Sequence, residues 1–152
     1  MAINGLNGSF AFEQGAVSRR TGELRFREAG FMSSAAVELG GEEGVEVTVP
    51  VLPQERIIQL FPPPYDLVKI DVEGSELDFL EAYDAVLSAT SHLILEWHSW
   101  HSGGGGETQI REVVARVGFV TIHDLIPAHA VKHNGQPARC GVLLCTRTPS
   151  VL

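Results

Sequence analysis

The sequence predicts a mixed α/β fold with a partly parallel sheet, and three observations support this prediction. The short apolar segment Leu67–Val72 is followed by a helical pattern of apolar residues, which is the order of a strand–turn–helix unit. The same order recurs where the segment His92–His98 is followed by a helical stripe over residues 110–117. Two more strands, Phe119–Leu125 and Gly141–Thr146, are expected to complete the sheet.

The part of the chain before these units reads as β-rich. Phe10–Val17 predicts a short strand, and both Glu23–Arg27 and Val45–Val49 alternate polar with apolar residues, as half-buried strands do. Residues 30–44 are rich in Gly, Ser and Glu and predict a loop. Pro53–Leu60 predicts one short helix, because proline suits a first-turn position that needs no N–H donor.

Local patterns also predict how the C-terminal half is connected. A helix is expected after the first strand, with Ser75 and Asp78 as a capping pair and an apolar stripe of Leu77, Leu80, Tyr83 and Leu87. Gly118 is the expected stop of the next helix. The last two strands are expected to be joined by a polar loop over residues 126–137.

Composition places the chain among ordinary globular proteins. Hydrophobic residues make up 44% and charged residues 20% of 152 residues, and no linker or repeat divides them, so residues 1–152 are expected to form a single domain. The formal net charge of −8 disfavours binding to the phosphates of nucleic acids and to anionic membrane surfaces.

The sequence predicts a cytoplasmic protein with free thiols. No apolar run is long enough to cross a bilayer, and no export signal is visible at the N-terminus. Cys140 and Cys145 would lie roughly 16 Å apart if both belong to one extended strand, which is too far for a disulfide. The histidines show none of the spacings of a structural zinc site.

Candidate site residues stand at the carboxyl ends of two predicted strands, where open α/β sheets bind their ligands. Asp71 and Glu73 end the first strand, and Glu96 and His98 end the second. If the two strands are parallel neighbours, these four side chains converge on one rim. Alternatively, Asp71 and Glu73 cap the following helix, and Lys69 is expected to form an ion pair with Glu96 or Glu73.

A glycine-rich segment follows the second of these strands. His101 precedes the run Gly103–Gly106, which lacks the residues of a phosphate-binding loop and is interpreted as a hinge or lid. This position makes His101 a candidate contact for a substrate.

Two blocks of sequence carry a resemblance to a known family. Residues 66–76, Asp-Leu-Val-Lys-Ile-Asp-Val-Glu-Gly-Ser-Glu, and then Leu93–His98 resemble the core of the FkbM-type methyltransferases. The upstream segments Gly22–Phe26 and Val45–Val49 agree with that pattern. The resemblance extends roughly from Asn4 to Thr146 and implies S-adenosylmethionine-dependent methyl transfer, commonly to an oxygen of a sugar, lipid or natural product.

The resemblance also implies a fold. It is the Rossmann-like class I methyltransferase sheet of seven strands, with the last strand inserted antiparallel, and the C-terminal strand pair here resembles its antiparallel end. The family's first strand, with a glycine-rich cofactor loop, and its second strand precede the part seen here. The sheet is therefore expected to be truncated at the N-terminus, with an open edge at Lys69–Val72. New pairing, a second copy or the upstream half of the enzyme would repair that edge.

Strand-end geometry and the resemblance together suggest roles for the site residues. His98 is the first candidate for the base that deprotonates a small-molecule acceptor, with Asp71 and Glu73 as alternatives. Asp71 and Glu73 are expected to contact the cofactor, and Glu96 and His101 the acceptor.

Other readings of the same residues remain open. No metal ligands are assigned, although Glu96 and Asp71 could hold Mg²⁺. A non-catalytic remnant that serves as a binding or structural module is the alternative function, and a metal-assisted hydrolase is a third.

Overall fold

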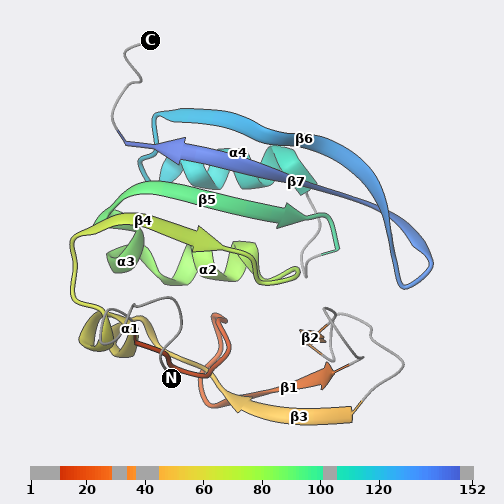
Figure 1. The fold of residues 1–152 in the computed structure, drawn as a ribbon, viewed down its shortest axis with the longest axis horizontal. Coiled ribbons are helices and arrows are strands. Elements are labelled where there is room, and N and C mark those ends of the chain that lie inside the picture. The colour runs from red at the N-terminus through yellow and green to blue at the C-terminus, as the bar shows by residue number, and fades with distance from the viewer. Residues whose placement is uncertain (1–10, 29–33, 37–44, 101–105, 148–152) are drawn as a thin grey trace, which may run out of the picture.

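The computed structural model describes residues 11–28, 34–36, 45–100 and 106–147, which form two sheets and four helices (Figure 1). In chain order the elements are β1 (Glu23–Glu28), β2 (Ser34–Ala36), β3 (Val45–Pro50), α1 (Gln54–Leu60), β4 (Tyr65–Ile70), α2 (Glu76–Ala82), α3 (Asp84–Ser88), β5 (Thr90–His98), α4 (Gly106–Arg116), β6 (Thr121–His133) and β7 (Gln136–Thr146).

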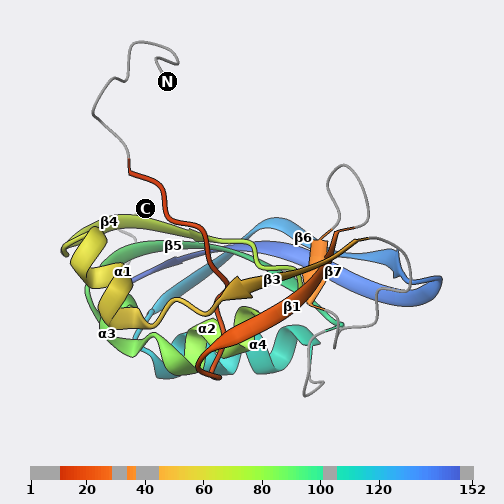
Figure 2. The same ribbon diagram turned by 90° about the horizontal axis from the view of Figure 1, so that it is seen from below.

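The larger sheet has the strand order β4-β5-β7-β6. Strands β4 and β5 are parallel, and β7 is antiparallel to both of its neighbours, β5 and β6. This arrangement confirms the predicted parallel pair and the predicted antiparallel C-terminal end. Helices α2, α3 and α4 lie together on one face of the sheet (Figure 2). Within the part of the chain that the structure describes, no helix covers the opposite face.

The smaller sheet is antiparallel, with the order β2-β1-β3. The two alternating segments form β1 and β3, as predicted, and pair along their whole length. The loop predicted over residues 30–44 contains the short strand β2, which was missed because Ser and Ala are weak strand formers. The rest of that loop lies outside the described residues.

The strand predicted over Phe10–Val17 is wrong for residues 11–17, where the structure has only an isolated parallel bridge between Ala16 and Val51. The Ala16 N–H donates to the carbonyl of Pro50 over 2.8 Å, and the Leu52 N–H donates to the carbonyl of Ala16 over 2.9 Å. Prolines at 50 and 53 have no N–H, so this stretch offers too few donors for a longer ladder.

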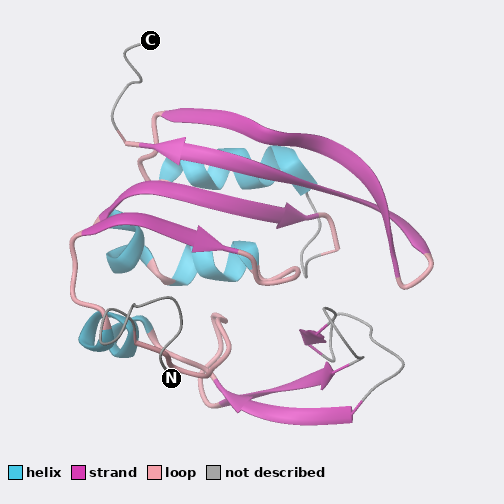
Figure 3. Cartoon of the chain, viewed as in Figure 1, coloured by secondary structure: helices cyan, strands magenta, loops and turns pink. Residues whose placement is uncertain are grey.

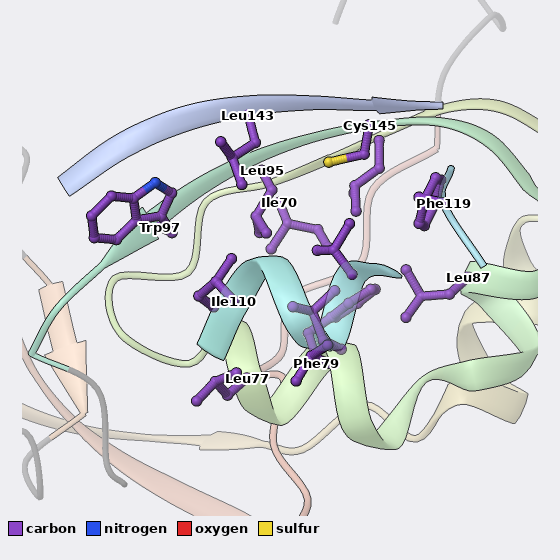
Figure 4. Close-up of a cluster of buried hydrophobic side chains, with 14 of the residues drawn as sticks. Ile70, Leu77, Phe79, Leu87, Leu95, Trp97, Ile110, Phe119, Leu143 and Cys145 are labelled. Atoms are coloured by element: carbon purple, nitrogen blue, oxygen red, sulfur yellow. The ribbon is translucent and has the colours of Figure 1, made fainter. Parts of the chain in front are cut away.

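The hydrophobic core lies between the larger sheet and its helices (Figure 4). Strand β5 contributes Leu93, Leu95 and Trp97 at alternate positions, and α4 contributes its predicted stripe, so residues from both sides interlock. The buried members of the cluster are Ile70, Leu77, Phe79, Leu80, Tyr83, Val86, Leu87, Leu93, Leu95, Trp97, Ile110, Val113, Val114, Phe119, Leu143 and Cys145.

The single helix predicted over the stripe of Leu77 to Leu87 is two helices, α2 and α3, which meet at Tyr83. The Tyr83 hydroxyl donates to the carbonyl of Leu52 over 2.7 Å, which ties this break to the N-terminal part of the chain. The predicted cap is also wrong. Ser75 makes no side-chain cap, because Asp78 instead accepts hydrogen bonds from Ser18 and Arg19.

The polar loop predicted over residues 126–137 is mostly strand (Figure 3). Strands β6 and β7 form one long hairpin whose turn is Asn134-Gly135, with φ angles of 48° and 75°. Asn-Gly is the pair that best tolerates positive φ in such a turn. Register shifts at Ile126 and the proline at 127 interrupt the alternation that would have predicted the strand.

The structure also bears on the predicted free thiols and on the search for a membrane-spanning helix. Cys140 and Cys145 both lie in β7 and both are free thiols, as predicted. Among the described residues, no helix has the length and apolar character needed to cross a bilayer.

Candidate active site at the carboxyl ends of β4 and β5

The parallel pairing of β4 and β5 brings the predicted site residues to one rim. The register sets Lys69 opposite Ile94, so the two strands end at the same edge of the sheet. Ligand-type atoms of Asp71, Glu96 and His98 all lie within 4.8 Å of one another. The convergence that the strand ends predicted is therefore present.

Glu73 joins the rim through a tight turn after β4. Glu73 and Gly74 have φ angles of 48° and 100°, a left-handed pair that reverses the chain into α2. This turn brings Glu73 Oε2 to 3.8 Å from His98 Nε2. Partial burial raises the pKa of the Glu73 carboxyl; nearby His98 opposes the shift, and Asp71, Glu76 and Glu96 add to it.

Glu76 is the site residue that sequence reasoning missed. Its side chain is fully buried, and its Oε1 accepts a hydrogen bond from His98 Nδ1 over 2.8 Å and from the Gly74 N–H over 2.9 Å. The signal was present, because Glu76 and Leu80 are four residues apart and share the apolar face of α2. A carboxylate on such a face needs a polar partner in the interior.

His98 is held between this buried carboxylate and the rim. Its side chain is 4% exposed, and its Nε2 faces Glu73 Oε2 at 3.8 Å and Glu96 Oε1 at 3.9 Å. Burial by itself lowers the pKa of His98, but the hydrogen bond to Glu76 and the surrounding carboxylates outweigh burial, so the pKa is raised.

Lys69 forms an ion pair with Asp71 over 2.8 Å, and not with Glu96 or Glu73 as predicted. The reason is that residues two apart on a strand share a face. The hydrogen bond to Asp71 is the main reason that the pKa of Lys69 is raised. The capping alternative for Asp71 and Glu73 is wrong, because the N-cap residue of α2 is Ser75 and no side-chain cap hydrogen bond forms there.

Aromatic rings connect the rim to the tip of the β6–β7 hairpin. Trp100 lies against His98, with ring centroids 4.4 Å apart, and stacks on His133 at the same separation with the rings nearly parallel. Among the described residues, the buried Nε1 of Trp100 finds no hydrogen-bond partner. His101, predicted to contact a substrate, lies outside the described residues, as do residues 103–105 of the glycine run.

Two hollows extend beyond this rim, and the first of them reaches it at Lys69 and Val72. One, of about 350 Å³, follows the outer edge of β4 and is lined mainly by apolar side chains, including Val17, Phe61 and Leu67. The other, of about 250 Å³, lies beside residues 18–22. In the described part of the chain β4 pairs only with β5, so the open edge predicted for this strand is present.

A family model for the methyltransferase FkbM domain matches residues 1–123. The matched region includes the whole rim and ends inside β6, so most of the β6–β7 hairpin lies beyond it. No curated protein and no solved structure is similar enough to count as a match.

Proposed function

Since this chain belongs to the FkbM methyltransferase family, we propose that it transfers the methyl group of S-adenosylmethionine to a hydroxyl oxygen of a sugar, lipid or natural product. One observation carries this proposal. His98, fixed by the buried Glu76, presents Nε2 to a rim of carboxylates at the ends of two parallel strands. A proton acceptor beside oriented polar groups is what an acceptor hydroxyl requires.

The rim fits one part of the cofactor. S-Adenosylmethionine supplies an electrophilic methyl group, and the carboxylates of Asp71 and Glu73 are suited to accept hydrogen bonds from its amino group or its hydroxyls. These two side chains are 35% and 45% exposed, so a ligand could reach them. The described residues contain no glycine-rich turn directly after a strand, so contacts to the adenosine part are left unassigned.

The proposed role of His98 is to accept the proton of the acceptor hydroxyl at Nε2. Glu76 keeps the other ring nitrogen hydrogen-bonded and therefore fixes the orientation of the imidazole. Glu96, 34% exposed and beside His98, would hold the acceptor by hydrogen bonding. A positioned base contributes about 10²–10⁴-fold to such a rate.

Two measurements test this proposal. Calorimetry with S-adenosylmethionine should show saturable binding by the full chain, and transfer of a labelled methyl group to a panel of hydroxyl compounds should reveal an acceptor. The change His98→Ala should lower kcat by about 10²–10⁴-fold and leave cofactor affinity unchanged. His123→Ala, on the exposed surface of β6, is the matched control and should change neither.

The alternative is a non-catalytic binding or structural module of the same family. It is favoured because the described residues contain no glycine-rich turn after a strand that could contact the adenosine part of the cofactor. A folded chain that neither binds the cofactor nor transfers a methyl group would support this alternative over catalysis.

A further inference from the structure

We infer that Asp71, Glu96 and His98 form a binding site for one divalent transition-metal cation of the Mn²⁺ or Zn²⁺ type. The three side chains come from the ends of two adjacent strands, and their ligand-type atoms lie within 4.8 Å of one another. One imidazole nitrogen and two carboxylates would leave further positions on the ion for water or for an acceptor oxygen.

The distances at the rim suit a shared ion better than hydrogen bonds. His98 Nε2 lies 3.9 Å from Glu96 Oε1, which is beyond hydrogen-bond range. With metal–ligand bonds of about 2.1 Å, two ligand atoms of one ion lie roughly 3.0 Å apart when adjacent and about 4.2 Å apart when opposite. The separation of Glu96 from His98 falls inside that range. The bound of 4.8 Å for all three ligand atoms exceeds its upper limit, so the side chains would have to move closer by roughly 0.6 Å to share one ion.

The buried pair of Glu76 and His98 is a second, independent observation. Metal-binding histidines usually donate their other ring N–H to a carboxylate, which fixes the ring and strengthens the ligand. Glu76 is fully buried and accepts from His98 Nδ1 over 2.8 Å. This leaves Nε2, on a side chain only 4% exposed, aimed at the rim with no hydrogen-bond partner among the described residues.

The charges at the rim also favour a cation. His98 is surrounded by four carboxylates, those of Asp71, Glu73, Glu76 and Glu96. Within the described residues, Lys69 is the only lysine or arginine that pairs with any of them. Lys69 already pairs with Asp71, so the other three carboxylates share one imidazole. A divalent cation between Nε2 and the carboxylates would relieve this repulsion.

The mixed ligand set selects the class of ion. Mg²⁺ and Ca²⁺ take oxygen ligands almost exclusively, whereas imidazole suits first-row transition metals. An ion here would place positive charge beside the acceptor oxygen. While the ion is bound, His98 Nε2 is a ligand, and Glu73, the alternative base beside it, would accept the proton. This catalytic role depends on the proposed function, but ion binding does not.

The test titrates Mn²⁺ into the full chain after treatment with a chelator, and follows loss of the free-ion electron paramagnetic resonance signal. We expect one ion per chain, displaced by Zn²⁺ and bound at least about tenfold more tightly than Mg²⁺. Asp71→Asn and His98→Ala should each weaken binding at least about tenfold. Asp66→Asn removes the same charge at the exposed opposite end of β4 and should have no effect.

Other variants keep the result decisive. If His98→Ala does not fold, as judged by circular dichroism, Glu96→Gln replaces it, because that side chain is partly exposed. No saturable Mn²⁺ or Zn²⁺ binding by the wild-type chain, or binding that survives both rim substitutions, would overturn the inference. Methyl transfer that persists in a chelator, without ion binding, would overturn it and leave the proposed function standing. Ion binding without any methyl transfer would support the ion site and count against the proposed function.

Discussion

Arg147 joins three segments of the chain through its guanidinium. It donates to the carbonyls of Leu87, Thr90 and Val117 over 2.7, 2.9 and 2.9 Å, which lie at the end of α3, the start of β5 and just beyond α4. Its charge also lies 4.6 Å above the ring of Phe119. A lysine could not replace it, because only a planar guanidinium group reaches several acceptors at once.

We therefore expect Arg147→Ala to lower the free energy of unfolding by about 2–4 kcal/mol, because three carbonyls lose a charged donor. Arg147→Lys should recover only part of that loss. The matched control is Arg116→Ala. The Arg116 side chain is 67% exposed, and its ion pair with Glu81 is long at 3.6 Å. Its loss should change the free energy of unfolding by less than about 0.5 kcal/mol. Urea unfolding measures all three, and equal effects for Arg147 and Arg116 would contradict this account.

Which side chains meet at the rim was predictable at the residue scale, but their partners were not. Asp71 and His98 could be placed together because parallel strands end at a common edge. Glu76 was missed because its role depends on a contact 22 residues away along the chain. The predicted partners of Lys69, Glu96 across the strands and Glu73 further along the chain, were wrong, because Asp71 two residues on shares its face and forms the ion pair. The chemical roles of these residues stay predictions.

The β6–β7 hairpin is the element whose geometry depends most on one residue. Gly135 has a φ of 75°, and an added Cβ would meet no atom of the described residues within 4 Å, so a substitution there acts through the backbone. The turn also positions His133 on Trp100 beside the candidate site.

Gly135→Ala should lower the free energy of unfolding by about 1–2 kcal/mol, because a Cβ is strained in the left-handed region. Gly135→Asn should cost less, since asparagine tolerates that conformation better. Chemical unfolding followed by tryptophan fluorescence measures both changes. An alanine variant as stable as the wild type would show that the turn does not adopt this conformation.

Sequence patterns predicted those elements whose periodicity is complete. The stripe of α4 and the alternation of β1 and β3 were correct because nothing interrupts them. Patterns failed where tertiary contacts decide. The hydrogen bond from Tyr83 to the carbonyl of Leu52 lies where one apolar stripe divides into two helices. In β6, Pro127 and the neighbouring register shifts interrupt the alternating pattern by which a strand is predicted.

At the scale of the whole molecule, a single layer of helices and one sheet enclose the core, and Cys145 reports on that interface. Its side chain is fully buried, and burial raises its pKa to about 12. A thiol with this pKa cannot form a thiolate at neutral pH, and a reagent can reach it only when sheet and helices separate.

In a Cys140→Ala chain, Cys145 is the sole thiol, and its alkylation by iodoacetamide at pH 8.5 should be at least about 10³-fold slower than in urea. The raised pKa also gives a pH dependence with a definite sign. This thiol has no effect on stability well below pH 9.0, and the free energy of unfolding should fall as pH rises from there toward about 12, because only the unfolded thiol ionises. Rapid alkylation without denaturant would contradict this picture.

The two outer strands of the larger sheet differ in how they meet solvent. Strand β6 contains Pro127, which has no N–H, and two register shifts, features that natural sheets use to discourage further pairing. Strand β4 has neither, and its free side opens onto the apolar hollow. A further strand can therefore extend this sheet in one direction only, by pairing with β4, whereas β6 closes the opposite edge.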